Sequence, residues 1–277
     1  MKLPPHASPV ERVFYYGVRV ATGLAIAFLI TPIAVIVPLS FTSGTLLIYP
    51  LPGFSLRWYA DFHTSPLWTA ATRNSLVIAV AVTALATALG TLAALGLHRA
   101  TFRGKPLVMG ILVAPLAVPI IITAVAVFYF YAWLGLAGTY AGIVLAHTAL
   151  ALPFVVVTVS ATLQGFDQNL VRSAASLGAS PLIVFRRVVL PLIAPGVVSG
   201  ALFAFVTSFD ELVVVLFLAS PEQRTLPRQI WSGVRESINP TITAAAVVLI
   251  LISIALMAMV ELLRRRGERL GGVARVP

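Results

Sequence analysis

Six long apolar segments, separated by short polar stretches, make up most of the chain. They cover about residues 18–41, 74–97, 106–134, 140–163, 194–219 and 241–263. Each segment reaches the roughly 20 residues that a helix needs to cross a bilayer. The pattern therefore predicts an all-α membrane protein with six transmembrane helices in residues 18–263, a polar N-terminal tail at 1–17 and a basic C-terminal tail at 264–277.

Composition supports this fold class. The chain is 59% hydrophobic and only 10% charged, with a mean hydropathy of +0.99, whereas about a quarter of the residues in soluble domains are charged. It has no cysteine, which excludes disulfides, thiolate catalysis and cysteine-based metal sites. The four histidines are far apart in sequence, so we expect no metal site.

The basic residues predict the orientation. With six spans both termini lie on one side of the membrane, and 14 of the 19 Lys and Arg residues fall on that side. An excess of Lys and Arg marks the cytoplasmic side, so both termini are expected to be cytoplasmic. The +10 net charge is explained by the same bias, and we expect no nucleic-acid partner.

A cytoplasmic hairpin is predicted at residues 167–191, between the fourth and fifth spans. Leu170, Ala174 and Leu177 recur at helical spacing and would share a face of a first short helix. Gly178 suits the left-handed conformation that ends many helices. The segment therefore reads as a helix followed by a tight turn.

A second short helix should follow that turn. Ser180 is a good N-cap, and Pro181 suits the first helical position, where no N–H is needed. Phe185 lies on one side of this helix, and Pro191 is expected to bend or stop it. Two helices around a tight turn suggest a docking element for a partner protein.

This hairpin resembles the cytoplasmic motif of permease subunits in binding-protein-dependent ABC importers. The family pattern is Glu-Ala-Ala, a glycine, and an Ile-x-Leu-Pro ending. Aligned on Gly178, the first three positions fall on Arg172, Ser173 and Ala174, and the ending falls on residues 188–191, including Leu190 and Pro191. The sequence departs from the family at Arg172, where the family has Glu, and this reversed charge puts any Glu-mediated contact in doubt.

The resemblance implies a type I ABC importer permease fold in a bacterial inner membrane. It implies three partners besides the lipid bilayer: a second, homologous permease, a dimer of ATPase subunits and an extracytoplasmic substrate-binding protein. The hairpin would couple this chain to the ATPase through Arg172, Ser173, Ala174, Gly178, Ser180, Pro181, Phe185, Leu190 and Pro191. The segment 208–242, which begins SFDELVVVLF, is similar to permeases of the spermidine/putrescine group.

No phosphate-binding GxxxxGK[ST] loop and no nucleophile–base motif occur in the sequence. We therefore expect a transport subunit rather than an enzyme. No cofactor is expected on this chain, and ATP and Mg²⁺ would bind to the partner ATPase.

Asp210 and Glu211 lie within the fifth predicted span. An ionised acid near mid-bilayer costs on the order of 2.5–3.5 kcal/mol on insertion scales. One interpretation is that at least one of them faces a hydrated path and attracts a cationic solute. The alternative is a structural ion pair or an interhelical hydrogen bond, for instance with Arg224, Arg228 or the companion permease.

The loop at 220–240 contains a short amphipathic segment that includes Trp231. It could be a re-entrant or interfacial helix near the outer gate, or a segment lying on the bilayer surface. Trp231 could stack on an ammonium group or act as an interface anchor. His147, in the fourth span, is expected to be a hydrogen-bonded packing residue rather than a proton carrier.

Two other functions remain open at this point. An ion-coupled secondary transporter could use Asp210 and Glu211 but would not need the docking hairpin. A membrane scaffold or sensor would transport nothing. The sequence favours half of an ATP-driven importer's path for a small cationic solute, such as spermidine or putrescine.

Overall fold

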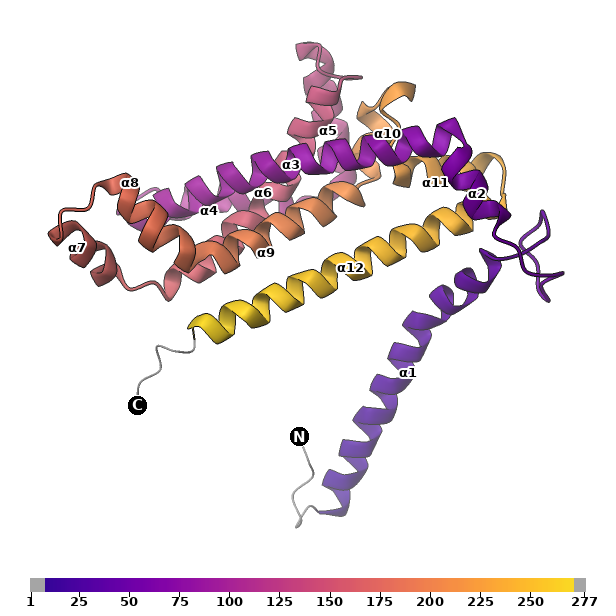
Figure 1. The fold of residues 1–277 in the computed structure, drawn as a ribbon, viewed down its shortest axis with the longest axis horizontal. Coiled ribbons are helices and arrows are strands. Elements are labelled where there is room, and N and C mark those ends of the chain that lie inside the picture. Colours follow the sequence, from indigo (N-terminus) through magenta and orange to yellow (C-terminus); the bar gives the residue numbers. More distant parts are fainter. Residues whose placement is uncertain (1–7, 272–277) are drawn as a thin grey trace. The chain divides into compact units, whose positions relative to one another are not determined.

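The computed structural model describes residues 8–271, and only the backbone of Val260 and residues 263–271. Within that range the regular secondary structure is helical, and Thr42 and Phe54 form an isolated β-bridge (Figure 1). The residues group into two units, the first containing residues up to 64 together with 233–249, and the second containing 65–232 together with residues from 250 onwards.

Fifteen helical elements follow one another along the described chain. They are α1 (Pro9–Leu39), α2 (Arg57–Thr64), α3 (Pro66–Arg99), α4 (Lys105–Val113), η1 (Ala114–Leu116), α5 (Ile120–Leu134), α6 (Tyr140–Gln164), α7 (Gln168–Ser176), α8 (Pro181–Val184), η2 (Phe185–Val189), α9 (Leu190–Phe209), α10 (Val213–Leu218), η3 (Pro221–Gln223), α11 (Leu226–Glu236) and α12 (Pro240–Gly271).

Five helices in the described part of the chain are long and apolar enough to span a membrane, and the number is six if the bent pair Lys105–Leu116 and Ile120–Leu134 counts as one span. The all-helical fold is thus confirmed, with five to six candidate spans. The first helix begins at Pro9 rather than residue 18, because Ser8 and Glu11 form a capping box there. Residues 1–7 and 272–277 of the two predicted tails lie outside the described residues.

The third predicted span is broken in its middle. The segment Lys105–Leu116 meets α5 at an angle of 101°, and Pro119 is the N-cap residue of α5. Pro119 lacks the N–H that would continue the helix, and Pro115 lies in the short 3₁₀ turn before it. The prolines therefore interrupt the span instead of being absorbed within one helix.

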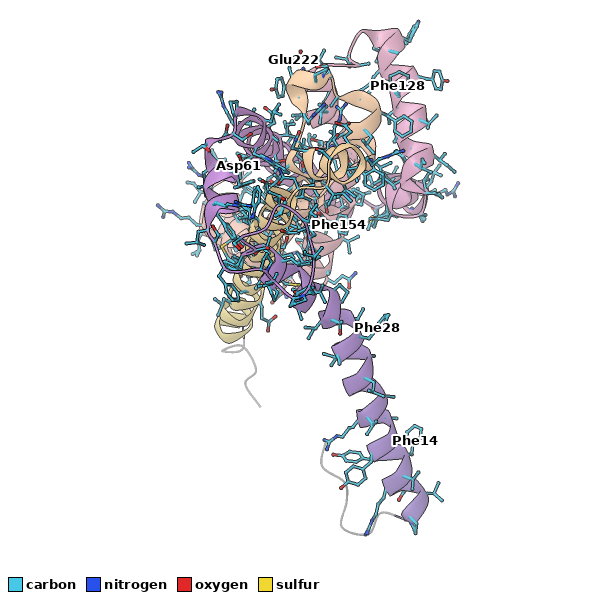
Figure 2. The ribbon with its side chains drawn as sticks, turned by 90° about the vertical axis from the view of Figure 1, so that its right-hand side faces the viewer. Phe14, Phe28, Asp61, Phe128, Phe154 and Glu222 are labelled. Atoms are coloured by element: carbon cyan, nitrogen blue, oxygen red, sulfur yellow. The ribbon has the colours of Figure 1, made fainter. Side chains whose placement is uncertain are left out.

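In the first unit, the loop after α1 is held by backbone and side-chain hydrogen bonds. Trp58 Nε1 donates to Thr42 O at 2.8 Å, and the hydroxyl of Thr241 donates to Asp61 Oδ2 at 2.6 Å. On α1, Phe14 and Phe28 project outward and are 72% and 78% exposed (Figure 2). An apolar helix with such exposure needs a bilayer or another subunit around it.

The core of the second unit consists of α3, α6 and α9, which pack against one another. Small residues allow the backbones to approach closely. Ala86, Gly90 and Ala94, which are spaced four residues apart on α3, are all buried, as expected of small residues at a helix–helix contact. A Cβ added at Gly90 would lie 2.7 Å from Cβ of Val155 on α6.

Gly90 and Gly96 form a matched pair on α3. We expect Gly90→Ala to destabilise the protein by roughly 1–3 kcal/mol, because the added methyl group overlaps Val155. A Cβ at Gly96 meets nothing within 4 Å, so Gly96→Ala should be neutral or stabilise by up to about 1 kcal/mol through helix propensity. Thermal unfolding of the detergent-purified variants checks this, and equal midpoints would contradict the packing argument.

The second unit places different features at its two ends. Helices α7 and α8 lie at one end of the α3–α6–α9 core, whereas α10 and α11 lie at the other (Figure 1). The predicted docking hairpin and the predicted acidic pair are therefore at opposite ends of this core.

Candidate functional site

The predicted hairpin is present, and its turn has the expected conformation. Asp167 caps α7 by accepting a hydrogen bond from Asn169 N at 2.8 Å. Gly178 has a φ of +83°, the left-handed conformation that favours glycine. Pro181 occupies the start of α8, as predicted, while Ser180 stands at the N-cap without a side-chain hydrogen bond.

The faces of the hairpin differ from the prediction. Ala174 and Phe185 pack against the core, but Leu170 is 44% exposed and Leu177 is 88% exposed. Arg172 and Ser173 are exposed too. The three residues predicted to share one face therefore separate, and the two leucines are left on the outer surface of the hairpin.

Pro191 was expected to bend or stop the second helix, and that expectation is wrong in one respect. The helix continues from Pro181 to Phe209, but residues 185–189 adopt a π-helical turn in which Leu190 N–H donates to Phe185 O. Pro191 has no N–H, and its ring would crowd the carbonyl of Arg187 in a regular α-helix. A wider turn relieves that conflict. Leu190 and Pro191 are exposed just after it.

The fifth predicted span also breaks, and the break falls at the two acids. Helix α9 ends at Phe209 and α10 begins at Val213. Glu211 Oε1 accepts a hydrogen bond from Val214 N at 2.8 Å, and Oε2 accepts one from Val215 N at 3.1 Å. Glu211 thus bonds to the first N–H groups of α10, which have no partner within the helix.

Glu211 is buried next to His147 of α6. His147 Nε2 lies 3.3 Å from Glu211 Oε2, an ion-pair distance, although the directions of the two groups do not satisfy hydrogen-bond geometry. His147 Nδ1 lies 2.9 Å from the hydroxyl of Ser208. The side chains of His147 and Glu211 are only 1% and 3% exposed, so water does not separate the two groups. His147 is thus a hydrogen-bonded packing residue, as predicted.

Asp210, in contrast, is exposed. It terminates α9 through a backbone N–H bond to Val206 O, and its carboxylate makes no hydrogen bond or ion pair with the described residues. The two acids therefore point into different environments. The predicted alternative of an ion pair between an acid and Arg224 or Arg228 is not what the structure contains, because Glu211 faces His147.

The two arginines bind other groups. Arg228 Nη1 donates to the carbonyl of Ala219 at 2.7 Å, at the end of α10, and Arg224 Nη1 donates to Gln229 Oε1 at 3.1 Å. Burial, and secondly the charge of Arg224, lower the pKa of Arg228. Arginine remains cationic in proteins, so Arg228 can stabilise the carbonyl end of α10.

Helix α11, which contains Trp231, is anchored by its N-terminal end. Leu226 is fully buried, and its N–H donates to the hydroxyl of Ser75 at 2.8 Å. Trp231 is 42% exposed and Val234 is 49% exposed. A buried first turn with exposed later residues favours a helix inserted into the protein over one lying flat on the bilayer surface.

The polar residues that anchor this loop were missed by the sequence analysis. Asn74 Nδ2 donates to the carbonyls of Glu222 and Arg224 at 2.8 and 3.0 Å, and Tyr140 donates to Asn74 Oδ1 at 2.8 Å. In the sequence, Asn74 and Tyr140 are polar residues at the edges of apolar segments. Such residues are too common for these two to be identified as anchors of the loop. The loop carrying Glu222 lies above the core in Figure 2.

The His147–Glu211 pair yields a stability prediction. His147→Ala should lower the stability by roughly 3 kcal/mol, because it removes a fully buried side chain together with its bond to Ser208 and its contact with Glu211. Ser208→Ala should cost less, about 1 kcal/mol, since it removes a single neutral hydrogen bond. Thermal unfolding midpoints of the purified variants measure both, and a His147→Ala protein as stable as the wild type would show that the pair contributes nothing.

The described residues contain no group of three or more His, Cys, Asp or Glu side chains that could hold a metal ion. At the break, backbone N–H groups bind the Glu211 carboxylate and Ser208 binds His147 Nδ1. The buried polar groups at the break between α9 and α10 thus have a structural role, and the carboxylate of Asp210 is exposed beside them.

The chain matches known transport proteins over most of its length. Residues 86–269 match the family described as "Binding-protein-dependent transport system inner membrane component". The spermidine/putrescine transport system permease protein PotC of Escherichia coli (strain K12) is 34% identical, covering 86% of this chain and 90% of the relative. The putrescine transport system permease protein PotI of the same strain is 35% identical, covering 82% of this chain and 83% of the relative.

The fold is also that of solved importers. A chain of a bacterial ABC transporter involved in import of the acidic polysaccharide alginate superposes with a TM-score of 0.73 at 17% identity, covering 93% of this chain and 99% of that one. The alginate transporter in complex with its pentasaccharide-bound periplasmic protein gives a TM-score of 0.70 over 93% of this chain and 96% of that one, again at 17% identity. This chain therefore belongs to the inner-membrane components of binding-protein-dependent transport systems, the permease subunits of ABC importers.

Proposed function

We propose that this chain forms half of the translocation path of an ATP-driven importer for a polyamine such as spermidine or putrescine. The observation that carries the proposal is the similarity to two polyamine permeases over more than four fifths of the chain. The exposed carboxylate of Asp210 at the break between α9 and α10 supports a cationic solute, because a negative charge raises the local concentration of cations.

The acids have different roles in this proposal. Asp210 faces the path and attracts the cation, whereas Glu211 binds the start of α10 and fixes the position of the break. Trp231 lies on α11, whose Arg228 binds the carbonyl end of α10. The Trp231 ring provides an aromatic face for an ammonium group near the outer end of the path.

The hairpin at residues 167–191 is the coupling element. The exposed Leu170, Arg172 and Leu177 contact the partner ATPase, and Ala174 and Phe185 transmit its movement because they pack against the core. A homologous second permease, two ATPase subunits that bind ATP and Mg²⁺, and a substrate-binding protein on the outer side complete the transporter. The termini and the hairpin face the cytoplasm under the positive-inside rule.

Transport driven by ATP requires that nucleotide binding favour one of two conformations of the permease pair. The ATPase does this by binding the hairpin differently in its open and closed states. In one conformation the path would be open at its outer end, so that Asp210 faces the binding protein. In the other conformation it would be open at its inner end, so that Asp210 faces the cytoplasm.

An uptake experiment tests the substrate class. The assembled transporter, in cells lacking other polyamine importers, should accumulate radiolabelled putrescine or spermidine. Uptake should follow cellular ATP and persist when the proton gradient is dissipated. Dependence on the gradient alone would indicate a secondary transporter, and absence of both uptake and substrate-stimulated ATP hydrolysis would indicate a scaffold. A binding protein that binds no diamine or triamine by calorimetry would exclude polyamines but not the importer.

Arg172 gives a separate prediction, because it reverses the charge at the docking surface. If the partner ATPase carries a compensating acid, Arg172→Glu should weaken the complex by about tenfold or more, since like charges at an interface cost several kcal/mol. Co-purification of the ATPase with the permease measures this. Arg99→Glu, the same reversal at the exposed end of α3, is the control. Unchanged assembly and transport in Arg172→Glu would show that position 172 does not take part in docking.

A further inference from the structure

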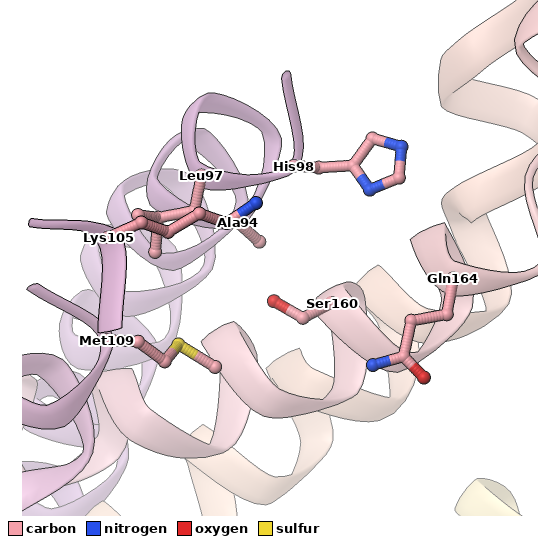
Figure 3. Close-up of a pocket in the computed structure, with 7 residues that line it drawn as sticks. All are labelled: Ala94, Leu97, His98, Lys105, Met109, Ser160 and Gln164. Atoms are coloured by element: carbon pink, nitrogen blue, oxygen red, sulfur yellow. The ribbon is translucent and has the colours of Figure 1, made fainter. Parts of the chain in front are cut away.

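A cavity of about 190 Å³ lies at the hairpin end of the core, away from the acids and from α11. Residues of α3, α4 and α6 line it (Figure 3). The lining residues are Ala94, Leu97, His98, Lys105, Met109, Ser160 and Gln164. The proposed transport path does not use any of them.

The lining divides into an apolar and a polar part. Ala94, Leu97 and Met109 form the apolar part. Lys105 lies on the α3–α4 side, and Ser160 and Gln164 of α6 lie opposite (Figure 3). None of the lining residues is acidic, so the polar part offers an ammonium, a hydroxyl and an amide, a set of donors suited to an anion.

Lys105 keeps most of its hydrogen-bonding capacity. Its Nζ donates to the carbonyl of Ala100 at 3.4 Å, a long distance for such a bond. An ammonium has three donors, so N–H groups remain for a ligand. Arg99, the last residue of α3, and Arg103, in the connection between α3 and α4, are both exposed. They add positive charge at this end of the core without lining the cavity.

Exposed apolar side chains lie beside this basic connection. Leu92 on α3 is 65% exposed, and Leu107 and Ile111 on α4 are 69% and 63% exposed. Where an apolar helix surface meets a cluster of Lys and Arg, the protein crosses from the hydrocarbon region to the headgroup region of the bilayer. The cavity therefore lies at headgroup depth, with surfaces for acyl chains next to it.

We propose that this cavity binds the headgroup phosphate of an anionic phospholipid. Lys105 pairs with the phosphate, and Ser160 and Gln164 donate hydrogen bonds from α6. The glycerol end of the lipid contacts Leu97 and Met109. Basic pockets between transmembrane helices at the cytoplasmic surface bind anionic headgroups in this way, and the apolar part of the lining favours a lipid over a free phosphate ion.

The site is connected to the hairpin. His98, at the cavity, has its Nε2 2.8 Å from the side-chain amide nitrogen of Gln168, the first residue of α7. An amide nitrogen can only donate, so Nε2 accepts this bond. A lipid that orders the α3–α4 connection would therefore also hold the start of the hairpin in place.

Thermal unfolding of the assembled transporter in a neutral detergent tests the proposal. Dihexanoyl phosphatidylglycerol should raise the unfolding midpoint by about 3 °C, whereas dihexanoyl phosphatidylcholine and inorganic phosphate should not. Lys105→Gln should abolish the rise and Ser160→Ala should reduce it. Arg103→Gln removes the same charge from the same connection outside the lining, and should retain the rise.

Comparison of the three additives and the variants distinguishes the possible ligands. A rise with inorganic phosphate equal to that with phosphatidylglycerol would assign the cavity to a soluble anion and overturn the lipid. Equal losses in Lys105→Gln and Arg103→Gln would show diffuse charge attraction rather than a site, and so would an undiminished rise in Lys105→Gln. No rise with phosphatidylglycerol would also overturn the proposal, and none of these results depends on the transported solute.

Discussion

Asp210→Asn is expected to lower uptake of a cationic solute by about tenfold or more, while the amount of permease in the membrane stays unchanged. Asparagine keeps the size and shape of the side chain but removes the charge. A hydrogen bond to a charged group contributes about 1.5–3 kcal/mol, and 1.4 kcal/mol corresponds to a factor of ten. Since the Asp210 carboxylate is exposed and bonds to no described residue, removing its charge should not destabilise the fold.

The neighbouring acid is expected to respond differently. Glu211→Gln places an amide where two backbone N–H groups of α10 and His147 now meet a carboxylate. One of those N–H groups then faces another donor, so this variant should lose stability and abundance in the membrane. Low uptake per cell in Glu211→Gln would thus reflect fewer transporters.

Initial uptake rates divided by the membrane abundance of each variant distinguish the two acids. Glu222→Gln is the matched control, because it neutralises an exposed acid of η3, just after α10, without touching the break between α9 and α10. Normal transport per molecule by both Asp210→Asn and Glu211→Gln would end the hypothesis that these acids serve the path.

Leu177→Asp is expected to abolish the coupling between ATP hydrolysis and transport. Leu177 is 88% exposed at the end of α7, next to the glycine turn of the hairpin. Such an exposed leucine contributes little to folding, so its replacement should change stability by no more than about 0.5 kcal/mol. In a docked complex it would be buried, and a carboxylate in an apolar docking site carries a large desolvation penalty.

The measurement is ATP hydrolysis by the reconstituted transporter with and without the loaded binding protein. We expect Leu177→Asp to reduce the stimulation to the basal rate, and uptake to fall with it. Leu46→Asp makes the same change at a leucine that is 63% exposed in the loop after α1, outside the hairpin, and should keep the stimulation. Full stimulation in Leu177→Asp would place the ATPase contact elsewhere.

Much of the architecture could be predicted because hydropathy and turn chemistry are local properties. Apolar segments of sufficient length identify the spans whatever their neighbours are. Gly178 and Pro181 indicated the hairpin turn because each has a restricted set of backbone conformations, and both have the expected positions.

The breaks within spans were harder to predict. Pro115 and Pro119 lie inside the third predicted span, and the effect of such prolines depends on whether neighbouring groups can bond to the freed carbonyls. The result here is a bend of 101°. Pro191 was expected to bend or stop a helix, and the helix continues past it through a π-turn at residues 185–189. No proline or glycine marks the interruption at residues 210–212 in the sequence. What stabilises it is the side chain of Glu211, which bonds to the first N–H groups of α10.

The sequence by itself determined the number of apolar segments, their helical nature, the transporter family and the presence of a charged pair inside a span. Tertiary structure alone decided that Asp210 is exposed while Glu211 is buried against His147. The two acids are adjacent in sequence and chemically alike, so no local property separates them. What separates them is α6, which brings His147 to the break from more than sixty residues away, and only packing can supply such a partner.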